Sequence, residues 1–235
     1  MKYKREEHMD KLEYLHNLEI FSGLKEEELK EIAKYFHLEE YKKGDYIFFE
    51  GDEEPGIYIV VEGIVKLTKE TADGKTVILK LVTPGEVFGW VVLGDSKPSS
   101  TYTAQALVDS KVLHISNKDF LMLLTSYPAI AVRITCIASK MVLEAYDRLK
   151  SLAVEKVEGR IANLLLELGK KIGQEKDGKI IIRSPITRQD LAEMTGTTVE
   201  TAIRIISRWK KEGVLDTERG KIEILNPEYL ESLVS

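Results

Sequence analysis

The chain has 235 residues, of which 43% are hydrophobic and one is cysteine, and its formal net charge is −5 at pH 7. This length and composition suit two domains with modest cores, and no apolar segment is long enough to span a bilayer. The N-terminal segment lacks the apolar core of a signal peptide, and one cysteine fits a reducing compartment, so we expect a cytoplasmic protein.

The first part of the chain is predicted to form short helices followed by an all-β roll. Residues 1–39 form a helical leader, in which Lys25–Phe36 is an amphipathic helix. Its inward face consists of Leu29, Ile32, Ala33 and Phe36. From Glu40 to Ser116, glycine, proline and aspartate turn signals separate short apolar runs such as Ile57–Val61 and Thr76–Val82. This density of turns predicts many short antiparallel strands.

A long helix is predicted from Pro128 to Leu152, with Pro128 in its first turn. One stripe of residues on it recurs at alternating spacings of four and three, as in a coiled coil. The members of this stripe, called the seam below, are Ala131, Thr135, Ala138, Val142, Ala145, Leu149 and Leu152. A second stripe, beginning with Ile130 and Ile134, suits packing on the chain's own roll. We expect the seam to pair with a second copy; the alternative is a monomer in which both stripes share one core.

After a hinge at Ala153–Lys156, the C-terminal part begins with a predicted helix at Val157–Ile172. A turn at Gln174–Lys179 and a strand at Ile180–Arg183 are expected to follow. This part carries 14 basic and 14 acidic residues, so the whole excess of negative charge lies in residues 1–154. The C-terminal part is therefore the one whose charge permits contact with nucleic acid.

Two short helices around a glycine follow. Thr187 and Asp190 form a capping box that opens a helix at Arg188–Thr195, and Gly196 supplies a tight turn. Thr197 is the expected N-cap of a second helix at Val199–Lys211. This is the spacing of a helix-turn-helix, whose second helix enters the major groove of DNA.

The second helix has one apolar face and one polar, basic face. Glu200 and Arg204 lie one turn apart on the polar face, where arginine suits guanine and glutamate suits the amino group of cytosine. Val199 and Ile203 lie beside them and suit thymine methyl groups. The alternative is that Glu200 belongs to a capping box with Thr197 and forms an ion pair with Arg204. On the same face, Arg208 and Lys211 are candidates for phosphate contacts.

Two short strands, Gly213–Thr217 and Lys221–Leu225, are predicted to flank a turn at Glu218–Gly220. They would make the motif a winged helix-turn-helix. Arg219 and Lys221 at the tip are candidates for phosphate contacts, the alternative being that they are merely solvated.

The sequence Val199-Glu200-Thr201 followed by Arg204 resembles the FNR-type branch of the CRP/FNR family of transcription regulators. The run Lys42–Leu67 resembles that family's cyclic-nucleotide-binding roll, and the similarity spans essentially the whole chain. It implies a palindromic DNA site with a TGA-like half-site core and RNA polymerase as a partner. The resemblance also implies backbone-positioning roles for Thr187, Arg188, Gln189, Thr198 and Thr201.

The candidate effector pocket departs from the pattern of the cyclic-AMP-binding members of that family. Those members hold the phosphate and ribose with a Gly-Glu pair and an Arg-Ser or Arg-Ala pair, where this chain has Gly89-Trp90 and Ser100-Thr101. We therefore expect no cyclic-AMP dependence. A pocket for another small molecule would be lined by Phe88, Gly89, Trp90, Ser100, Thr101, Tyr102 and Tyr146. The alternative is that the aromatic residues are core and the pocket is empty.

Other cofactors and catalysis are tested by counting ligands. Cys136 alone cannot hold an iron–sulfur cluster, and it is either a packed residue or a redox switch. The four histidines are scattered, so we expect no metal site, and haem would need an unusual ligand set. No catalytic motif is present, so we expect no catalytic residues and no enzymatic activity.

These patterns together predict an α+β protein with three parts: an N-terminal antiparallel β-roll sensor domain (1–127), a dimerisation helix and hinge (128–154), and a C-terminal winged helix-turn-helix domain (155–235). The predicted function is a homodimeric, sequence-specific regulator that binds double-stranded DNA. Two alternatives stay open, namely a member that senses haem or another small molecule, and a ligand-binding roll that does not contact DNA.

Overall fold

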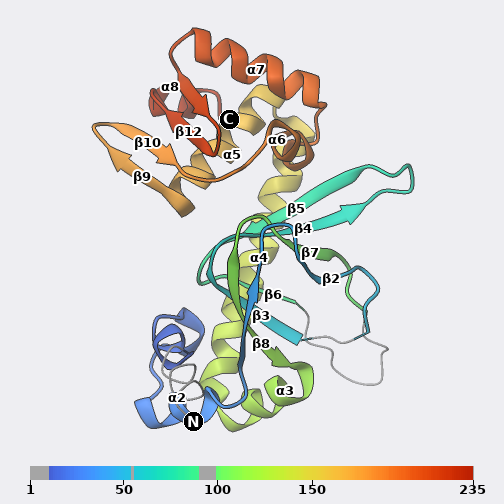
Figure 1. Ribbon diagram of the computed structural model, residues 1–235, viewed down its shortest axis with the longest axis vertical. Coiled ribbons are helices and arrows are strands. Elements are labelled where there is room, and N and C mark those ends of the chain that lie inside the picture. The colour runs from blue at the N-terminus through green and yellow to red at the C-terminus, as the bar shows by residue number, and fades with distance from the viewer. Residues whose placement is uncertain (1–10, 54–55, 90–98, 235) are drawn as a thin grey trace. The chain divides into compact units, whose positions relative to one another are not determined.

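The computed structural model describes residues 11–53, 56–89 and 99–234 (Figure 1). The chain divides into two compact units, which are treated separately below. The first unit comprises Met1–Lys69 and Lys80–Val142, and the second comprises Glu70–Leu79 and Leu143–Ser235.

Two four-stranded sheets form the roll of the first unit. One has the strand order β1-β8-β3-β6 and the other β2-β7-β4-β5. The pairs β1/β8, β3/β8, β3/β6, β2/β7 and β4/β7 are antiparallel. The strands are β1 (His37–Tyr41), β2 (Tyr46–Phe48), β3 (Gly56–Glu62), β4 (Val65–Glu70), β5 (Thr76–Val82), β6 (Val87–Gly89), β7 (Thr103–Ala106) and β8 (Ser110–Ser116). The tip of the β4–β5 hairpin belongs to the second unit. The predicted strand at Thr76–Val82 is confirmed.

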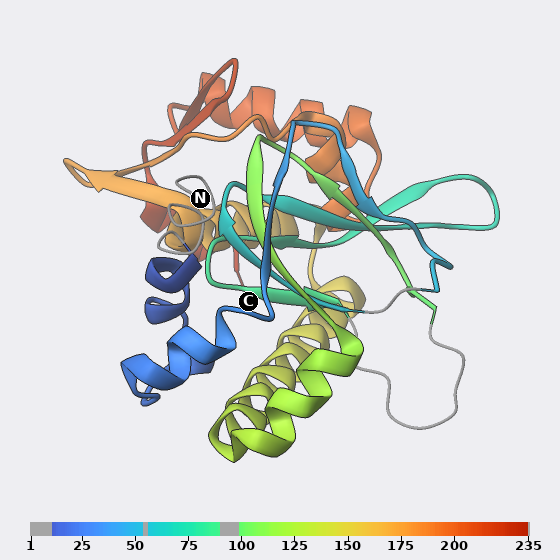
Figure 2. The ribbon, with the colours of Figure 1, turned by 60° about the horizontal axis from the view of Figure 1, so that its bottom comes forward.

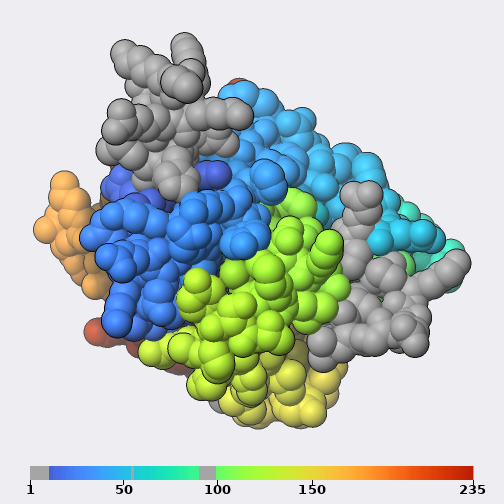
Figure 3. Space-filling view, turned by 90° about the horizontal axis from the view of Figure 1, so that it is seen from below, coloured from blue at the N-terminus to red at the C-terminus, as the bar shows by residue number. Residues whose placement is uncertain are grey.

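Helices cover the first sheet and share a core with it. They are the 3-10 helix η1 (Glu19–Phe21), α2 (Glu26–Ile32), α3 (Asn117–Ser126) and the beginning of α4 (Pro128–Val154). Figure 3 shows the N-terminal helices and α3 side by side on one face of this unit. The predicted inward face of α2 is confirmed, since its four members are 0–2% exposed. The helix ends at Ile32 rather than Phe36, because residues 33–35 form turns.

α3 and α4 are joined at Tyr127, where the chain bends by 116° (Figure 2). Ser116 caps α3 by accepting a hydrogen bond from the backbone N–H of Asp119. Ile130 on α4 is fully buried, and Ile134 and Ile137 pack partly against the same core, as predicted for the second stripe. Among the described residues, no single helix is both long and apolar enough to cross a membrane; α3 and α4 meet the two conditions only when taken together, as a bent pair.

The second unit is a helical domain with one small sheet. Its helices are α5 (Val157–Ile172), α6 (Arg188–Thr195), α7 (Val199–Lys211) and α8 (Pro227–Ser232). The sheet has the order β11-β12-β10-β9, formed by β9 (Gly173–Lys176), β10 (Lys179–Ile182), β11 (Leu215–Glu218) and β12 (Lys221–Ile224). The predicted bounds of α5, α6 and α7 are confirmed.

Several bounds predicted in this unit were wrong in detail. A strand, β9, stands where a turn was expected, because Asp177 and Gly178 at positive φ make a tight hairpin that pairs Lys176 with Lys179. The first wing strand begins at Leu215 rather than Gly213. The hinge is also shorter than expected, since α4 continues to Val154.

The class of fold is the predicted one. An antiparallel β-roll, a long helix and a helix-turn-helix with wing strands follow one another along the chain.

Candidate nucleic-acid interface

The turn between α6 and α7 is fixed by local hydrogen bonds. Thr187 Oγ1 accepts a hydrogen bond from the backbone N–H of Asp190 at 3.1 Å, and Asp190 Oδ2 accepts one from the backbone N–H of Thr187 at 2.8 Å. The predicted capping box is therefore confirmed. At the other end of α6, Gly196 adopts the left-handed conformation with φ 63°. A side chain there would be strained, so glycine is required for this turn.

The N-cap of α7 is Thr198, not Thr197 as expected. The Thr198 side chain accepts a hydrogen bond from the backbone N–H of Thr201 at 3.2 Å. Thr197 is one residue too early, because α7 begins at Val199, and its N–H donates to the carbonyl of Ala192 at the end of α6. Glu200 is consequently the second residue of α7, and its alternative assignment to a capping box with Thr197 is wrong.

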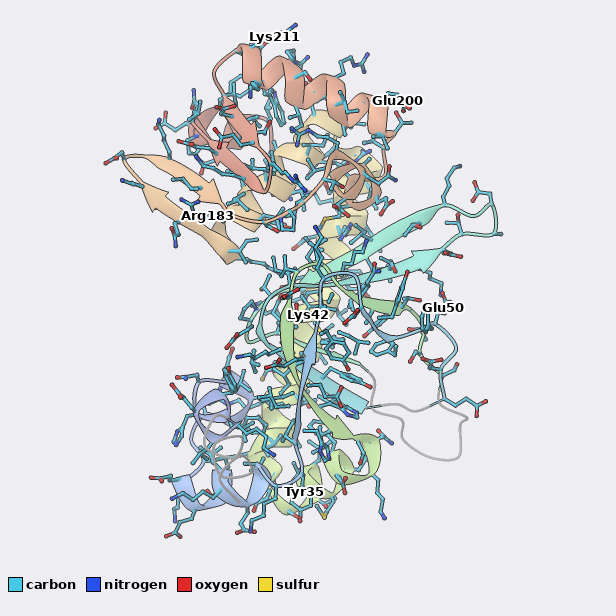
Figure 4. All side chains as sticks on the ribbon, viewed as in Figure 1. Tyr35, Lys42, Glu50, Arg183, Glu200 and Lys211 are labelled. Atoms are coloured by element: carbon cyan, nitrogen blue, oxygen red, sulfur yellow. The ribbon has the colours of Figure 1, made fainter. Side chains whose placement is uncertain are left out.

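One face of α7 is buried and the other is exposed. Ala202, Ile205, Ile206 and Trp209 are 0–6% exposed, and Trp209 is fully buried. Figure 4 labels Glu200 and Lys211 at the two ends of the helix, whose polar side chains project away from the rest of its unit. Glu200 and Arg204 are exposed, Ile203 is 46% exposed and Val199 is half-buried. The polar face is thus accessible along the whole of α7.

Glu200 and Arg204 have no hydrogen bond or ion pair with any described residue. The alternative prediction, an ion pair between Glu200 and Arg204, is therefore not met in the described residues. Both side chains keep their full capacity for hydrogen bonding, arginine as a bidentate donor and glutamate as an acceptor.

The candidate phosphate-contacting residues surround this face, and some of their side chains already have partners within the protein. Lys211 and Arg219 are exposed, whereas Arg188 donates to Thr217 Oγ1 at 2.8 Å, and burial lowers the pKa of its guanidinium. Gln189 donates to Glu193 at 2.6 Å and Lys221 pairs with Glu223 at 2.7 Å. Thr187, Thr198 and Thr201 belong to the two helix caps, and Arg208 forms an ion pair with Glu158.

A groove of about 520 Å³ runs between the start of α5 and the exposed side of α7. Its lining residues are Lys156, Val157, Glu158, Thr201, Arg204, Ile205 and Arg208. Three of them are cationic and one is anionic, so the groove is net positive. A groove of this charge beside exposed base-reading candidates is suited to a polyanion.

Glu158 was missed by the sequence analysis. Its Oε1 forms an ion pair with Arg208 and accepts a hydrogen bond from the buried indole Nε1 of Trp209 at 3.0 Å. The carboxylate raises the pKa of the Arg208 guanidinium by this hydrogen bond. The two partners are 50 residues or more away along the chain, so no local spacing could have indicated them. One carboxylate thus fixes the second half of α7 to the first turn of α5.

Removing this carboxylate is expected to destabilise the second unit. Glu158→Ala should lower the free energy of unfolding by about 1–3 kcal/mol, because it leaves a buried indole donor without its acceptor. Denaturant unfolding followed by the fluorescence of Trp209, in a Trp90→Phe background, measures the loss. Glu158→Gln keeps an acceptor oxygen, so its free energy of unfolding should lie between those of the parent chain and Glu158→Ala. A Glu158→Ala chain as stable as its parent would show that this contact contributes nothing.

The candidate effector residues lie in the first unit, apart from Tyr146. Phe88 and Tyr102 belong to a buried aromatic cluster with Phe48 and Tyr58, whose neighbouring ring centroids are 5.2–6.1 Å apart. Tyr102 Oη accepts a hydrogen bond from the backbone N–H of Gly89 at 2.9 Å, and burial raises the pKa of Tyr102 to about 12. The interior of the roll is therefore packed with aromatic rings at these positions.

The other candidates of this set are placed differently. Ser100 is buried, and its carbonyl accepts a hydrogen bond from the N–H of Gly51, while the carbonyl of exposed Thr101 accepts one from Lys69. Tyr146 is 64% exposed and belongs to the second unit. Trp90 lies outside the described residues. No group of three or more His, Cys, Asp or Glu side chains in the described ranges is arranged to hold a metal ion.

The seam is largely unpartnered in the single chain. Val142, Leu149 and Leu152 are 51%, 61% and 44% exposed, and Ala138 and Ala145 are exposed as well. Thr135 is exposed and Ala131 is half-buried. Cys136 is also exposed on this helix, so it is not packed within the single chain. The stripe presents apolar surface that a single chain does not cover.

These features define a two-part DNA-binding regulator in which a β-roll domain is followed along the chain by a long helix and a winged helix-turn-helix. Comparison with known proteins supports this. Residues 38–127 match the cyclic nucleotide-binding domain, and residues 159–233 match the Crp-like helix-turn-helix domain. The chain belongs to the CRP/FNR family of transcription regulators, which are not enzymes.

Individual relatives agree along most of the chain. It is 30% identical to the cyclic AMP receptor protein of Thermus thermophilus, over 91% of this chain and 95% of that protein. The transcriptional regulator SdrP of the same organism is 30% identical, over 82% of this chain and 92% of that one. The structure of FixK2 from Bradyrhizobium japonicum matches with a TM-score of 0.75 and 25% identity, covering 85% of this chain and 98% of that one.

Proposed function

We propose that this DNA-binding regulator acts as a homodimer on a palindromic site with a TGA-like half-site core, without control by cyclic AMP. The observation that carries the site assignment is the pair Glu200 and Arg204, exposed one turn apart at the start of α7 and free of partners among the described residues. In a helix-turn-helix, the first turns of the second helix meet base edges.

Each base-reading role follows from the chemistry of the side chain. Arg204 donates two hydrogen bonds to guanine O6 and N7, and Glu200 accepts one from the amino group of cytosine. Val199 and Ile203 contact the methyl groups of neighbouring thymines. The 46% exposure of Ile203 supports this role, since an isoleucine on a polar face has no core to fill.

Phosphate contacts surround these base contacts. We assign them to Thr187, Arg188, Gln189, Thr198, Thr201, Arg208, Lys211, Arg219 and Lys221. The positive groove beside α7 supports the set, and each contact adds to the salt dependence of binding. Arg208 contributes while bound to Glu158, so its charge is partly neutralised before DNA arrives.

The dimer forms through the seam, which places two copies of α7 on the two half-sites. The exposed stripe from Val142 to Leu152 supports this assignment, because pairing would bury it. Residues 1–127 then act as sensor, 128–154 as dimerisation helix and hinge, and 155–235 as DNA-binding domain. RNA polymerase is the further partner, and the cytoplasm is the compartment.

The aromatic packing of the roll supports independence from cyclic AMP. Phe48, Tyr58, Phe88 and Tyr102 fill the core between the sheets, and no arginine occurs between Arg5 and Arg133 to pair with a cyclic phosphate. One relative carries the name cyclic AMP receptor protein, so this point needs a direct test.

Selection of bound sequences from random DNA tests the proposal. It is run with the protein alone, with cyclic AMP and with a metabolite extract. We expect palindromic sites with a TGA-like core in all three arms and no gain from cyclic AMP. Recovery of single half-sites only would contradict the homodimer. Enrichment of sites only in the presence of cyclic AMP would contradict the proposed independence from cyclic AMP.

Ile203→Ser is expected to remove the preference for thymine in the selected sites and to keep the preference for guanine. The change deletes the apolar contact with a thymine methyl group and leaves Arg204 and Glu200 in place. The same selection experiment measures it, with Ser207→Ala on the exposed side of α7 as the control. An unchanged preferred sequence would rule out this role for Ile203.

A further inference from the structure

Arg148 lies near the end of α4, where three segments of the second unit meet. Its Nη1 donates a hydrogen bond to the carbonyl of Leu79 at 2.6 Å. Its Nη2 donates to the carbonyl of Ile78 at 3.0 Å and to the carbonyl of Met194 at 2.5 Å. Leu79 and Ile78 belong to the β4–β5 hairpin and Met194 belongs to α6. One guanidinium therefore joins three segments that are distant in sequence.

The carbonyl that Arg148 binds on α6, that of Met194, is one that the helix cannot satisfy itself, because the last four carbonyls of a helix lack intrahelical donors. The N–H groups of Gly196 and Thr197 both donate to Ala192, and the last two carbonyls of the helix are those of Met194 and Thr195. Arg148 takes the first of these, and Arg160 takes the second with a 2.8 Å bond from its Nε. Two cations thus cap the negative end of α6.

Arg160 also fixes this end of α6 to the hinge, since its Nη1 donates to the carbonyl of Glu155 at 2.8 Å. Next to it, a Cβ on Gly196 would lie 3.3 Å from the Leu152 side chain. The end of α4, the hinge and the end of α6 are consequently held together by hydrogen bonds and close packing.

What holds α6 also holds α7. Only residues 196–198 separate the two helices, and both bury their inner faces in the same unit through side chains such as Leu191 and Ile205. The first turn of α7, which carries Glu200, follows directly from the position of the last turn of α6.

We propose that Arg148 is a positioning residue for DNA binding, which couples the hairpin segment Glu70–Leu79 and the end of α4 to the placement of α7. Both segments continue along the chain into the first unit. A movement of either segment would therefore reach the helix-turn-helix through the hydrogen bonds of Arg148. The planar fork of arginine suits this role, because it donates to several fixed carbonyls at once, whereas a lysine offers one ammonium. The inference rests on the DNA-binding function of the family and not on the half-site proposed above.

A distance measurement tests the coupling without DNA. Spin labels are attached to Ala72→Cys on the exposed hairpin tip and to Gln189→Cys on exposed α6, in a Cys136→Ser background, and labelled chains are diluted with unlabelled ones. We expect one narrow distance distribution in the parent and a broad one with Arg148→Met. Lys150→Met, an exposed cation two residues further on, should leave it narrow. Equal distributions in Arg148→Met and its parent would overturn the proposal.

DNA affinity supplies the second measurement. Arg148→Met should weaken binding to a selected site by at least about tenfold, and leave binding to random DNA and the salt dependence unchanged, because the Arg148 guanidinium already donates to three backbone carbonyls of the protein. Arg148→Lys should lose less. If Arg148→Met does not fold, Arg148→Lys is carried through both measurements. An equal loss of affinity for specific and random DNA would overturn the proposal. If no preferred site can be selected at all, the proposed sequence specificity is wrong, and the distance measurement, which needs no DNA, still tests the role of Arg148.

Discussion

A Leu149→Glu chain is expected to run as a single subunit and to bind the palindromic site at least about 100-fold more weakly. Leu149 is 61% exposed in the single chain and lies in the middle of the second half of the seam. A glutamate there would face its own copy across the two-fold axis, and two like charges would be desolvated together. A single subunit meets one half-site, so its affinity falls toward that for random DNA, which is about 10³ to 10⁷ weaker than specific binding.

Leu143→Glu is the matched control for this change. Leu143 is 63% exposed on the same helix, so the substitution and its effect on the free chain are alike. At about 100° per residue, Leu143 is turned about 120° away from Leu149, off the seam. We expect it to remain a dimer in analytical ultracentrifugation and to keep its affinity. If both variants behave the same way, the seam is not the contact between subunits.

The elements of the second unit could be predicted closely because their signals are local. α7 has a hydrophobic face with a period of 3.6 residues, and α6 is bounded by a capping box and a left-handed glycine. The errors fell where two neighbouring residues compete for one role. Thr197 and Thr198 are both residues favoured as N-caps, and the structure assigns the cap to Thr198, whose side chain accepts the hydrogen bond from the N–H of Thr201.

β9 was missed for a different reason. Its sequence, Gly173–Lys176, is polar and mostly exposed, so it has no alternation of apolar residues. It is a strand because it pairs with β10 at the edge of the sheet. Edge strands of this kind are determined by their neighbour rather than by their own side chains.

The candidate site shows the same division between local and distant signals. The exposed residues of α7 could be found from the helical period alone, since exposure on one helix follows from its own sequence. The residues that hold α7 in place could not. Glu158 contacts Trp209 across 51 positions, and Arg148 contacts Met194 across 46 and Ile78 across 70. A charged residue on a helix gives no sign of which distant backbone carbonyl or indole it will meet.

Leu152 has two roles that the sequence pattern cannot separate, one in the seam and one at the turn of the helix-turn-helix. By spacing it is the last member of the seam, yet it also lies against Gly196 in the turn of the helix-turn-helix. Its 44% exposure is lower than that of Leu149 for this reason. The proposed dimer contact and the turn of the helix-turn-helix therefore share this side chain. A change at Leu152 would affect both, so Leu149 is the better test of the seam.

Arg204→Ala is expected to weaken binding to the palindromic site by about 2–6 kcal/mol, or roughly 30-fold to 10⁴-fold. A bidentate contact between arginine and guanine contributes about 1–3 kcal/mol of discrimination, and the palindrome contains it twice. The structure offers Arg204 nothing to bind within the described residues, so removing it leaves no buried partner unsatisfied and stability should not change. Fluorescence anisotropy with the selected site, and with sites changed at the guanine, measures both affinity and preference.

Two controls separate base recognition from charge. Arg204→Lys keeps the charge but not the fork, so it should lose most of the guanine preference. Lys211→Ala removes an exposed charge from the same helix and should weaken all sequences equally, with a smaller salt slope. If Arg204→Ala also weakens all sequences equally, Arg204 contacts a phosphate, and the guanine must be read by another residue. The preference for one base, rather than the size of the loss, therefore decides whether Arg204 reads sequence.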